Sequence, residues 1–325
     1  MSVVADEAPI EVRGLVKRYG ELTAVAGIDL TVRAGDVYGY LGPNGAGKTT
    51  SLRMMLGLIR PTEGTVRLFG RDPQASVAAL EGVAGFVEAP AFYPYMSGRR
   101  NLELLAAFDG HGAGERIDEA LRIVELSGRA KDRVGGYSHG MRQRLGIAAS
   151  LLRAPKLLLL DEPATGLDPA GMRDMRLLIR RLADEGMTVM LSSHLLGEVE
   201  ELCNRVAIVR SGSMVYEGAI SELRRQAGTG YRLSTTDDVR ALEVCRAAAG
   251  LDDVGEHAGR ITFSSNEAAV AALSRELVQA GALIRELATQ TVTLEDLFFS
   301  LTEGTPPDAG SGAAVSPAPE TAGVS

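Results

Sequence analysis

The sequence has 325 residues, of which 45% are hydrophobic and 23% are charged, and its formal net charge is −8. This length and composition suit a globular protein with one large and one small domain. The acidic balance argues against a general affinity for nucleic acid or anionic lipid. No apolar run approaches the roughly 20 residues that a membrane-spanning helix needs, and the N-terminus has no signal-peptide pattern. We therefore expect a cytosolic chain, or one held at a membrane only through a partner.

The N-terminal stretch predicts three strands ahead of a glycine-rich loop. Residues 1–8 are small and acidic and are expected to be frayed, and strands are expected at 10–16, 28–32 and 36–41. Tyr19 follows the first strand. An aromatic ring there is suited to stack on an adenine, although tyrosine is also an ordinary residue at the end of a strand.

The glycine-rich loop lies between the strand at 36–41 and a helix predicted at 51–58. Its residues are Gly42, Pro43, Asn44, Gly45, Ala46, Gly47, Lys48, Thr49 and Thr50. Strand, loop and helix are the context of a P-loop, whose backbone N–H groups surround a phosphate at a helix N-terminus. In that arrangement Lys48 reaches the β- and γ-phosphates and the Thr49 hydroxyl binds Mg²⁺. The sequence therefore predicts binding of a nucleoside triphosphate.

The following segment predicts helices inserted into an α/β core. Strands are expected at 65–69 and 82–87, and the latter leads to Glu88. Residues 97–127 have helical spacing with a break at 109–114, and a further helix extends to about residue 153. We interpret residues 89–153 as a helical subdomain.

Two acids end the most apolar strand of the chain, at 157–161. A strand apolar on both faces suits the centre of a covered parallel sheet. Asp161 is placed to hold Mg²⁺ through water, and Glu162 to polarise an attacking water. By themselves the P-loop and these acids leave kinases, GTPases and other ATPases open. His194 follows the strand at 187–191 and is either a contact of the γ-phosphate or a structural residue.

A second unit is predicted after the core. A helix at 195–202 and strands at 206–209 and 214–216 continue the strand–helix alternation of a parallel α/β fold. The composition changes at 224–230, and residues 231–303 predict a small α+β domain with the order βαβαβ, ferredoxin-like or related. A further helix is expected from Thr293. Residues 304–325 are dominated by small residues and Pro and are expected to be disordered.

The order of these motifs resembles the ATP-binding subunit of an ABC transporter across about residues 10–226. Tyr19 matches the adenine-stacking aromatic, residues 42–49 match Walker A, and residues 157–162 match Walker B. Residues 138–141 match the signature loop, residues 166–168 the D-loop, and His194 the switch histidine. The signature helix ahead of Walker B separates this family from GTPases and kinases. The resemblance implies a P-loop, RecA-like ABC ATPase fold in which Ser138, Gly140 and Asp168 face the nucleotide of an opposing subunit.

The chain departs from the family pattern at two positions. Glu88 stands where a Gln usually binds Mg²⁺ and senses the lytic water. A carboxylate there can still bind Mg²⁺, but its charge near the phosphates predicts slower hydrolysis or an altered metal dependence. The signature loop reads Tyr-Ser-His-Gly-Met instead of Leu-Ser-Gly-Gly-Gln. Ser138 and Gly140 are kept, and His139 and Met141 differ.

The resemblance also implies partners. One motif set is present, so ATP and Mg²⁺ are expected between two copies of the chain in a homodimer. The segments 87–93, 137–145 and 293–298 resemble bacitracin-type and daunorubicin-type exporters, in which the ATPase and the permease are separate chains. We therefore expect a peripheral protein at the cytoplasmic face of the membrane, which powers export of a drug, peptide or lipid through a permease.

Two alternatives remain open at this point. One is a soluble ABC ATPase that acts on ribosomes or DNA, although the acidic balance predicts no nucleic-acid partner. The other is a permease partner with regulatory binding and little turnover. The aromatic cluster at residues 92–95 is either a permease contact or packing inside the helical subdomain.

Overall fold

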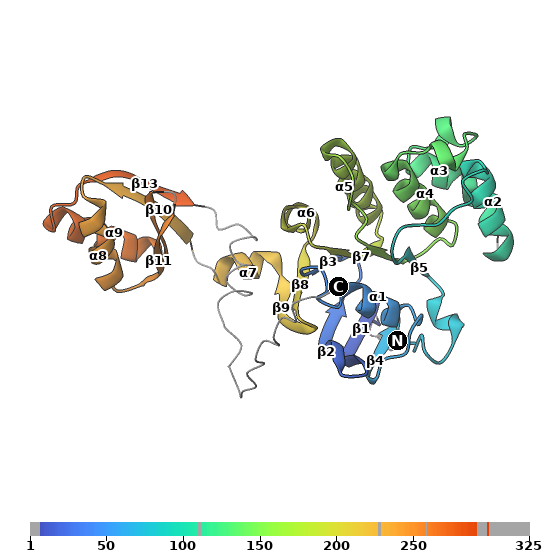
Figure 1. Ribbon diagram of the computed structural model, residues 1–325, viewed down its shortest axis with the longest axis horizontal. Helices are drawn as coiled ribbons and strands as arrows, with labels where there is room; N and C mark the ends of the chain where they lie inside the picture. Colours follow the sequence, from blue (N-terminus) through green and yellow to red (C-terminus); the bar gives the residue numbers. More distant parts are fainter. Residues whose placement is uncertain (1–6, 110–111, 227–228, 258, 291–297, 299–325) are drawn as a thin grey trace, which may run out of the picture.

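A six-stranded sheet carries the glycine-rich loop in the computed structural model, which describes residues 7–109, 112–226, 229–257, 259–290 and 298 (Figure 1). Its strands are β3 (Val37–Leu41), β5 (Val83–Phe86), β6 (Leu157–Asp161), β7 (Thr188–Ser193), β8 (Arg205–Arg210) and β9 (Ser213–Ala219). They lie in the order β5-β6-β7-β3-β8-β9, and all neighbours are parallel except β8 and β9. The carboxyl ends of β3, β6 and β7 therefore meet at one edge of the sheet.

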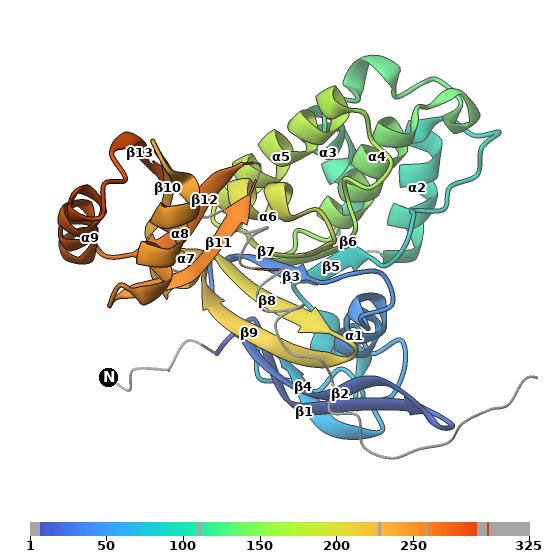
Figure 2. The same cartoon turned by 60° about the vertical axis from the view of Figure 1, so that its left-hand side comes forward.

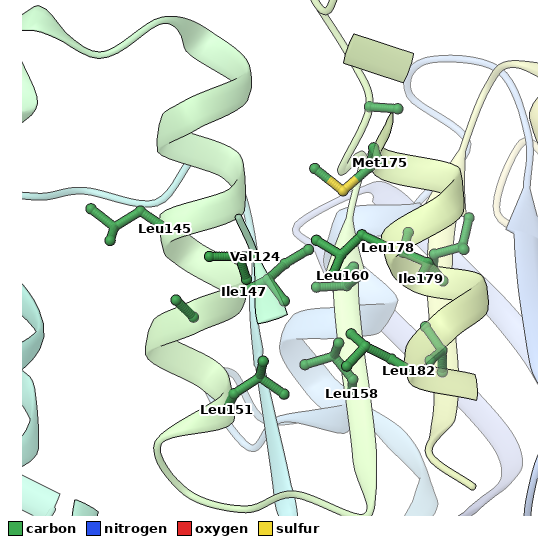
Figure 3. Packing of buried hydrophobic residues seen from close by; sticks show 14 of the residues in the cluster. Val124, Leu145, Ile147, Leu151, Leu158, Leu160, Met175, Leu178, Ile179 and Leu182 are labelled. Carbon is green, nitrogen blue, oxygen red and sulfur yellow. The ribbon is translucent and has the colours of Figure 1, made fainter. Parts of the chain in front are cut away.

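Strand β6 is buried on both faces, as its apolar sequence predicts. Leu158 and Leu160 belong to the core beneath α4 (His139–Leu151) and α5 (Pro169–Asp184), and Figure 3 shows β6 between these two helices. Leu157 and Leu159 belong to the core on the opposite face. Because both faces are covered, this strand can consist entirely of leucine up to its terminal acid.

A separate antiparallel sheet covers the core on the face of β6 that lies opposite α4 and α5. It has the order β2-β1-β4, with β1 (Ile10–Tyr19), β2 (Leu22–Val32) and β4 (Glu63–Leu68). Helix α1 (Lys48–Met55) contacts β2 and β4 as well as β6 of the central sheet. Strand β2 begins six residues earlier than its hydrophobic pattern indicates, since most of the side chains from residue 22 to 27 are exposed and give no apolar alternation.

The inserted helices form a layer beside the central sheet (Figure 1). They are α2 (Gly98–Asp109), α3 (Ile117–Ile123) and α4, and residues 110–111 in the predicted break lie outside the described part. Further helices are α6 (Leu196–Leu202) and α7 (Ile220–Gln226), the latter where the sequence shows only a change in composition. Short 3₁₀ turns are η1 (Val77–Leu80), η2 (Ala113–Arg116), η3 (Ser127–Arg129) and η4 (Val134–Gly136).

The C-terminal unit differs from the predicted βαβαβ order. It contains β10 (Thr229–Thr235), α8 (Asp238–Ala247), β11 (Leu251–His257), β12 (Arg260–Ser265), α9 (Glu267–Gln279) and β13 (Ile284–Gln290). The βαβαβ prediction is wrong because it omits β11. This strand lies at the edge of the sheet and carries Asp252, Asp253 and Glu256. Asp252 and Asp253 separate the two apolar residues that pack on the core, so its sequence shows no apolar alternation. The observed βαββαβ order and the antiparallel arrangement β11-β12-β10-β13 are ferredoxin-like (Figure 2).

Several predictions concern residues outside the described part of the chain. These are the frayed stretch as far as residue 6, the helix expected from Thr293, and the tail at 304–325. Phe298 is described, and its side chain packs against the core beneath α4 and α5. Among the described helices, none is long and apolar enough to span a membrane.

Candidate functional site

The glycine-rich loop has a backbone that only glycine fits at two positions. Gly47 has a φ of +93°, and a Cβ there would lie 2.3 Å from the Ala24 carbonyl oxygen. A Cβ on Gly42 would lie 2.4 Å from the Val209 carbonyl oxygen. The loop residues Asn44, Gly45, Gly47, Thr49 and Thr50 line a cleft of about 310 Å³ at the N-terminus of α1, and Pro43 and Ala46 complete the turn. Backbone N–H groups and the helix dipole make such a cleft suited to phosphates.

Lys48 is the buried cation of this cleft. Its Nζ donates to the carbonyl oxygens of Gly42 at 2.7 Å and Pro43 at 3.2 Å. The same Nζ lies 3.1 Å from Oε1 of Glu162. The ammonium group is therefore held between the loop and the acid that follows β6, where a phosphate in the cleft would meet it.

Asp161 and Thr49, which follows Lys48 in the chain, form a hydrogen-bonded pair. Thr49 Oγ1 donates to Asp161 Oδ2 at 2.9 Å, and Ser192 Oγ donates to Asp161 Oδ1. The pairing of Asp161 with Ser192 follows from the register of the parallel strands β6 and β7. No cluster of three or more His, Cys, Asp or Glu side chains suited to a metal occurs in the described ranges. One hydroxyl and one carboxylate nevertheless fit Mg²⁺, which takes its other oxygen ligands from phosphates and water.

Glu162 is fixed from several sides. Its φ is +49°, and its N–H donates to Ser192 Oγ at 3.0 Å. Thr165 Oγ1 and His194 Nδ1 both donate to Glu162 Oε2, each at 2.7 Å. Burial favours the neutral acid, but the hydrogen bonds from Thr165 and His194 and the charge of Lys48 outweigh it and hold the pKa of Glu162 below its ordinary value. The side chain is therefore an oriented carboxylate at neutral pH.

Two further predicted residues lie at the margin of the cleft. The Glu88 N–H points to Asp161 Oδ2 at 3.4 Å, but the Glu88 carboxylate forms an ion pair with Arg53 of α1. Glu88 has a φ of +68°, so the loop after β5 turns sharply there. Tyr19 is 49% exposed at the end of β1, with Lys17 Nζ 5.0 Å from the centre of its ring. A flat, exposed ring of this kind is available for stacking.

The signature-loop residues line a second groove. Ser138 caps α4 and accepts a hydrogen bond from the Met141 N–H at 3.2 Å, and Asp168 caps α5 and accepts one from the Gly171 N–H at 3.0 Å. Ser138, Gly140 and Asp168 share this groove, whereas Lys48, Glu162 and His194 share the P-loop cleft. The structure thus brings the predicted residues together in two groups.

Comparison with known proteins places this geometry in a family. Residues 25–165 match the model of the ABC transporter family. The bacitracin transport ATP-binding protein BcrA of Enterococcus faecalis is 37% identical over 300 residues, which cover 92% of this chain and 97% of that protein. The daunorubicin/doxorubicin resistance ATP-binding protein DrrA of Streptomyces peucetius is 40% identical over 226 residues, 68% of each chain. A solved ATP-binding subunit of an ABC transporter has 27% identity and a TM-score of 0.60 over 67% of this chain and 92% of that one.

The chain belongs to the ABC transporter ATP-binding proteins. This ABC protein therefore binds ATP, and its family couples ATP hydrolysis to transport. The same α/β fold recurs in a dimeric ATP-binding cassette bound to ADP and phosphate, at 24% identity and a TM-score of 0.58 over 65% of this chain and 98% of that one.

Sequence reasoning missed two side chains of the ABC site, Ser192 and Thr165, and the contact that His139 makes. Ser192 contacts both acids, Thr165 holds Glu162, and His139 donates to the Thr165 carbonyl oxygen at 3.0 Å. A signal for Ser192 was present, because polar residues at the ends of neighbouring parallel strands meet at one sheet edge. No local pattern indicates the other two contacts, which join segments that the fold brings together.

Proposed function

We propose that this chain is the ATP-hydrolysing subunit of an exporter, in which it drives a drug, peptide or lipid through a separate membrane permease. The observation that carries the proposal is the Glu162 carboxylate, held by Thr165 and His194 at the P-loop cleft, 3.1 Å from Lys48. The relatives named for bacitracin transport and daunorubicin resistance support the export of such compounds. A subunit of this kind would lie on the cytoplasmic face of the membrane, bound to its permease.

In the proposed mechanism, the P-loop amides and Lys48 bind the phosphates of ATP, and Tyr19 stacks on the adenine. Thr49 and Asp161, with Glu88 near them, would hold Mg²⁺, which neutralises phosphate charge when it is bound. Glu162 orients a water and accepts its proton as the water oxygen bonds to the γ-phosphorus. The bond to the β,γ-bridging oxygen breaks and releases ADP and phosphate. His194 keeps the Glu162 carboxylate in place and faces the γ-phosphate.

The signature-loop groove would serve the second nucleotide. We propose a homodimer in which Ser138, Gly140 and Asp168 of each copy face the ATP in the P-loop of the other. The N-terminus of α4, where Ser138 is the cap residue, would supply the positive end of the helix dipole and first-turn N–H donors for a γ-phosphate. Two chains closing on ATP and reopening after hydrolysis would move the permease.

We propose that the loop after Glu88 contacts the permease. Phe92 packs against the core, but Tyr93 and Tyr95 are 49% and 64% exposed with ring centres 5.7 Å apart. Exposed aromatic side chains are enriched where proteins bind partners.

We propose that residues 9–226 form the ATPase domain, with 89–153 as its helical subdomain and 231–303 as a C-terminal domain before a tail at 304–325.

The test is a pull-down with the Glu162→Gln protein from detergent-solubilised native membranes in the presence of ATP. This variant keeps the P-loop and loses the proton acceptor, so we expect it to bind ATP, to lose hydrolysis, and to capture a multi-spanning membrane protein. Lys48→Ala is the matched control, because it should lose ATP and with it the ATP-dependent capture. Ribosomal or DNA-bound partners with nothing from the membrane would refute the proposal. Equal, negligible ATPase rates in wild type and Glu162→Gln would instead indicate a low-turnover regulatory partner.

A further inference from the structure

His139 joins two segments of the site that are far apart in sequence. It is the first residue of α4 and follows the cap residue Ser138. In the family pattern a glycine stands at this position of the signature loop, so the imidazole is an addition in this chain. The side chain is half-buried and extends toward the segment between β6 and α5.

The imidazole contacts the backbone on two sides of one peptide unit. His139 Nε2 lies 3.0 Å from the Thr165 carbonyl oxygen. A carbonyl oxygen only accepts, so Nε2 carries the proton and donates. The ring also lies against Gly166, since a Cβ placed on that glycine would be 3.6 Å from Cδ2 and Nε2 of His139. The signature loop therefore fixes the position of the 165–166 peptide.

Thr165 in turn fixes Glu162. Its Oγ1 donates to Glu162 Oε2 at 2.7 Å, and its N–H donates to the Glu162 carbonyl oxygen at 3.2 Å. Glu162 needs such support because a left-handed backbone is unfavourable for a side chain with a Cβ. An unbroken series of hydrogen bonds thus extends from the signature loop to the carboxylate that orients the water, within a single chain.

We propose that His139 is a positioning residue that couples the signature loop to Glu162 of the same chain. The inference rests on the proposed dimer, in which the signature loop of one copy faces the ATP bound by the other. ATP in that second site fixes the loop, and His139 then fixes Thr165 and the Glu162 carboxylate in the first site. Hydrolysis in one site therefore depends on occupancy of the other.

The first test compares two amides at this position in the full chain. In His139→Gln the side-chain nitrogen is as many bonds from Cβ as Nε2 is, so the donor is retained. In His139→Asn the nitrogen is one bond closer and does not reach Thr165. We expect kcat of the Asn variant to be about fivefold lower than that of the wild type, because this factor corresponds to the net free energy of one hydrogen bond. The KM for ATP should stay within about twofold, since His139 does not line the P-loop cleft, and the Gln variant should be close to wild type.

The Hill coefficient tests the dependence between the two sites. We expect a value above 1 for ATP hydrolysis by the wild type and by His139→Gln, and a value near 1 for His139→Asn. Wild-type kcat and an unchanged Hill coefficient in His139→Asn would overturn the inference. Equal losses in the Gln and Asn variants would also overturn it, because the effect would then not follow the donor.

A double-mutant cycle with Thr165→Val shows whether His139 acts through Thr165. If it does, His139→Asn adds little to the loss already caused by Thr165→Val. If the fold-losses in kcat of the two single variants multiply in the double variant, His139 acts directly on the nucleotide and not through Thr165, which overturns the inference. Glu162→Gln in the same assay separates the two proposals. A wild-type rate in that variant refutes the proposed function itself, whereas an inactive Glu162→Gln beside a fully active His139→Asn refutes the coupling alone.

Discussion

Replacement of Ser192 by alanine tests how Asp161, the last residue of β6, and Glu162, which follows it, are held in place. Its hydroxyl donates to Asp161 Oδ1 and accepts the Glu162 N–H at 3.0 Å, and the residue is fully buried. A hydrogen bond to a charged group contributes about 1.5–3 kcal/mol and a neutral one about 1 kcal/mol. Ser192→Ala should therefore lower the free energy of unfolding by about 3 kcal/mol, or the Tm by roughly 6–12 °C for a unit of this size.

The assay is thermal unfolding of the full chain, with Ser150→Ala as the control. Ser150 is also buried, but its Oγ makes a single neutral hydrogen bond, to the Gly146 carbonyl oxygen at 3.0 Å within α4. The control should lose about 1 kcal/mol. The ATPase rate should fall in Ser192→Ala, since Asp161 and Glu162 lose a shared support, and should persist in the control. Equal Tm shifts in the two variants would refute the reasoning.

Two further predictions concern nucleotide binding and pH. Tyr19→Ala should raise the Kd for ATP about tenfold, which corresponds to the free energy of one base stacked on an aromatic ring, and Tyr19→Phe should retain the affinity. Equal losses of ATP affinity in the two variants, measured by calorimetry, would contradict stacking. The lowered pKa of Glu162 predicts a stabilising carboxylate whose contribution is complete above its ordinary pKa and is lost as the pH falls through the lower, folded-state value. Thr165→Val removes a hydrogen bond that lowers this pKa and so brings the folded-state pKa of Glu162 closer to its ordinary value. Urea unfolding as the pH is lowered from about 7 should therefore show a smaller acid-induced loss of stability than in wild type. Identical pH profiles would show that Thr165 does not set this pKa.

The sequence by itself determined the parts of the protein that depend on local patterns. The P-loop needs glycine where the chain takes a positive φ or passes close to another backbone, and Gly47 meets both conditions. The leucine run of β6 indicated a strand buried on both faces, and the acids at its end were predicted to lie by the loop. These properties are readable because each arises from residues that are neighbours in the chain.

Only the tertiary structure decided how separate segments meet. The sequence did not indicate strand β11 because its acidic residues leave no apolar alternation. The strand forms at the edge of the sheet, where backbone pairing with β12 holds it. Glu88 was expected near a metal, and the fold also places Arg53 within reach of its carboxylate. The contact of His139 with Thr165 joins residues 26 positions apart. Such contacts depend on strand register and helix packing, which no local pattern specifies.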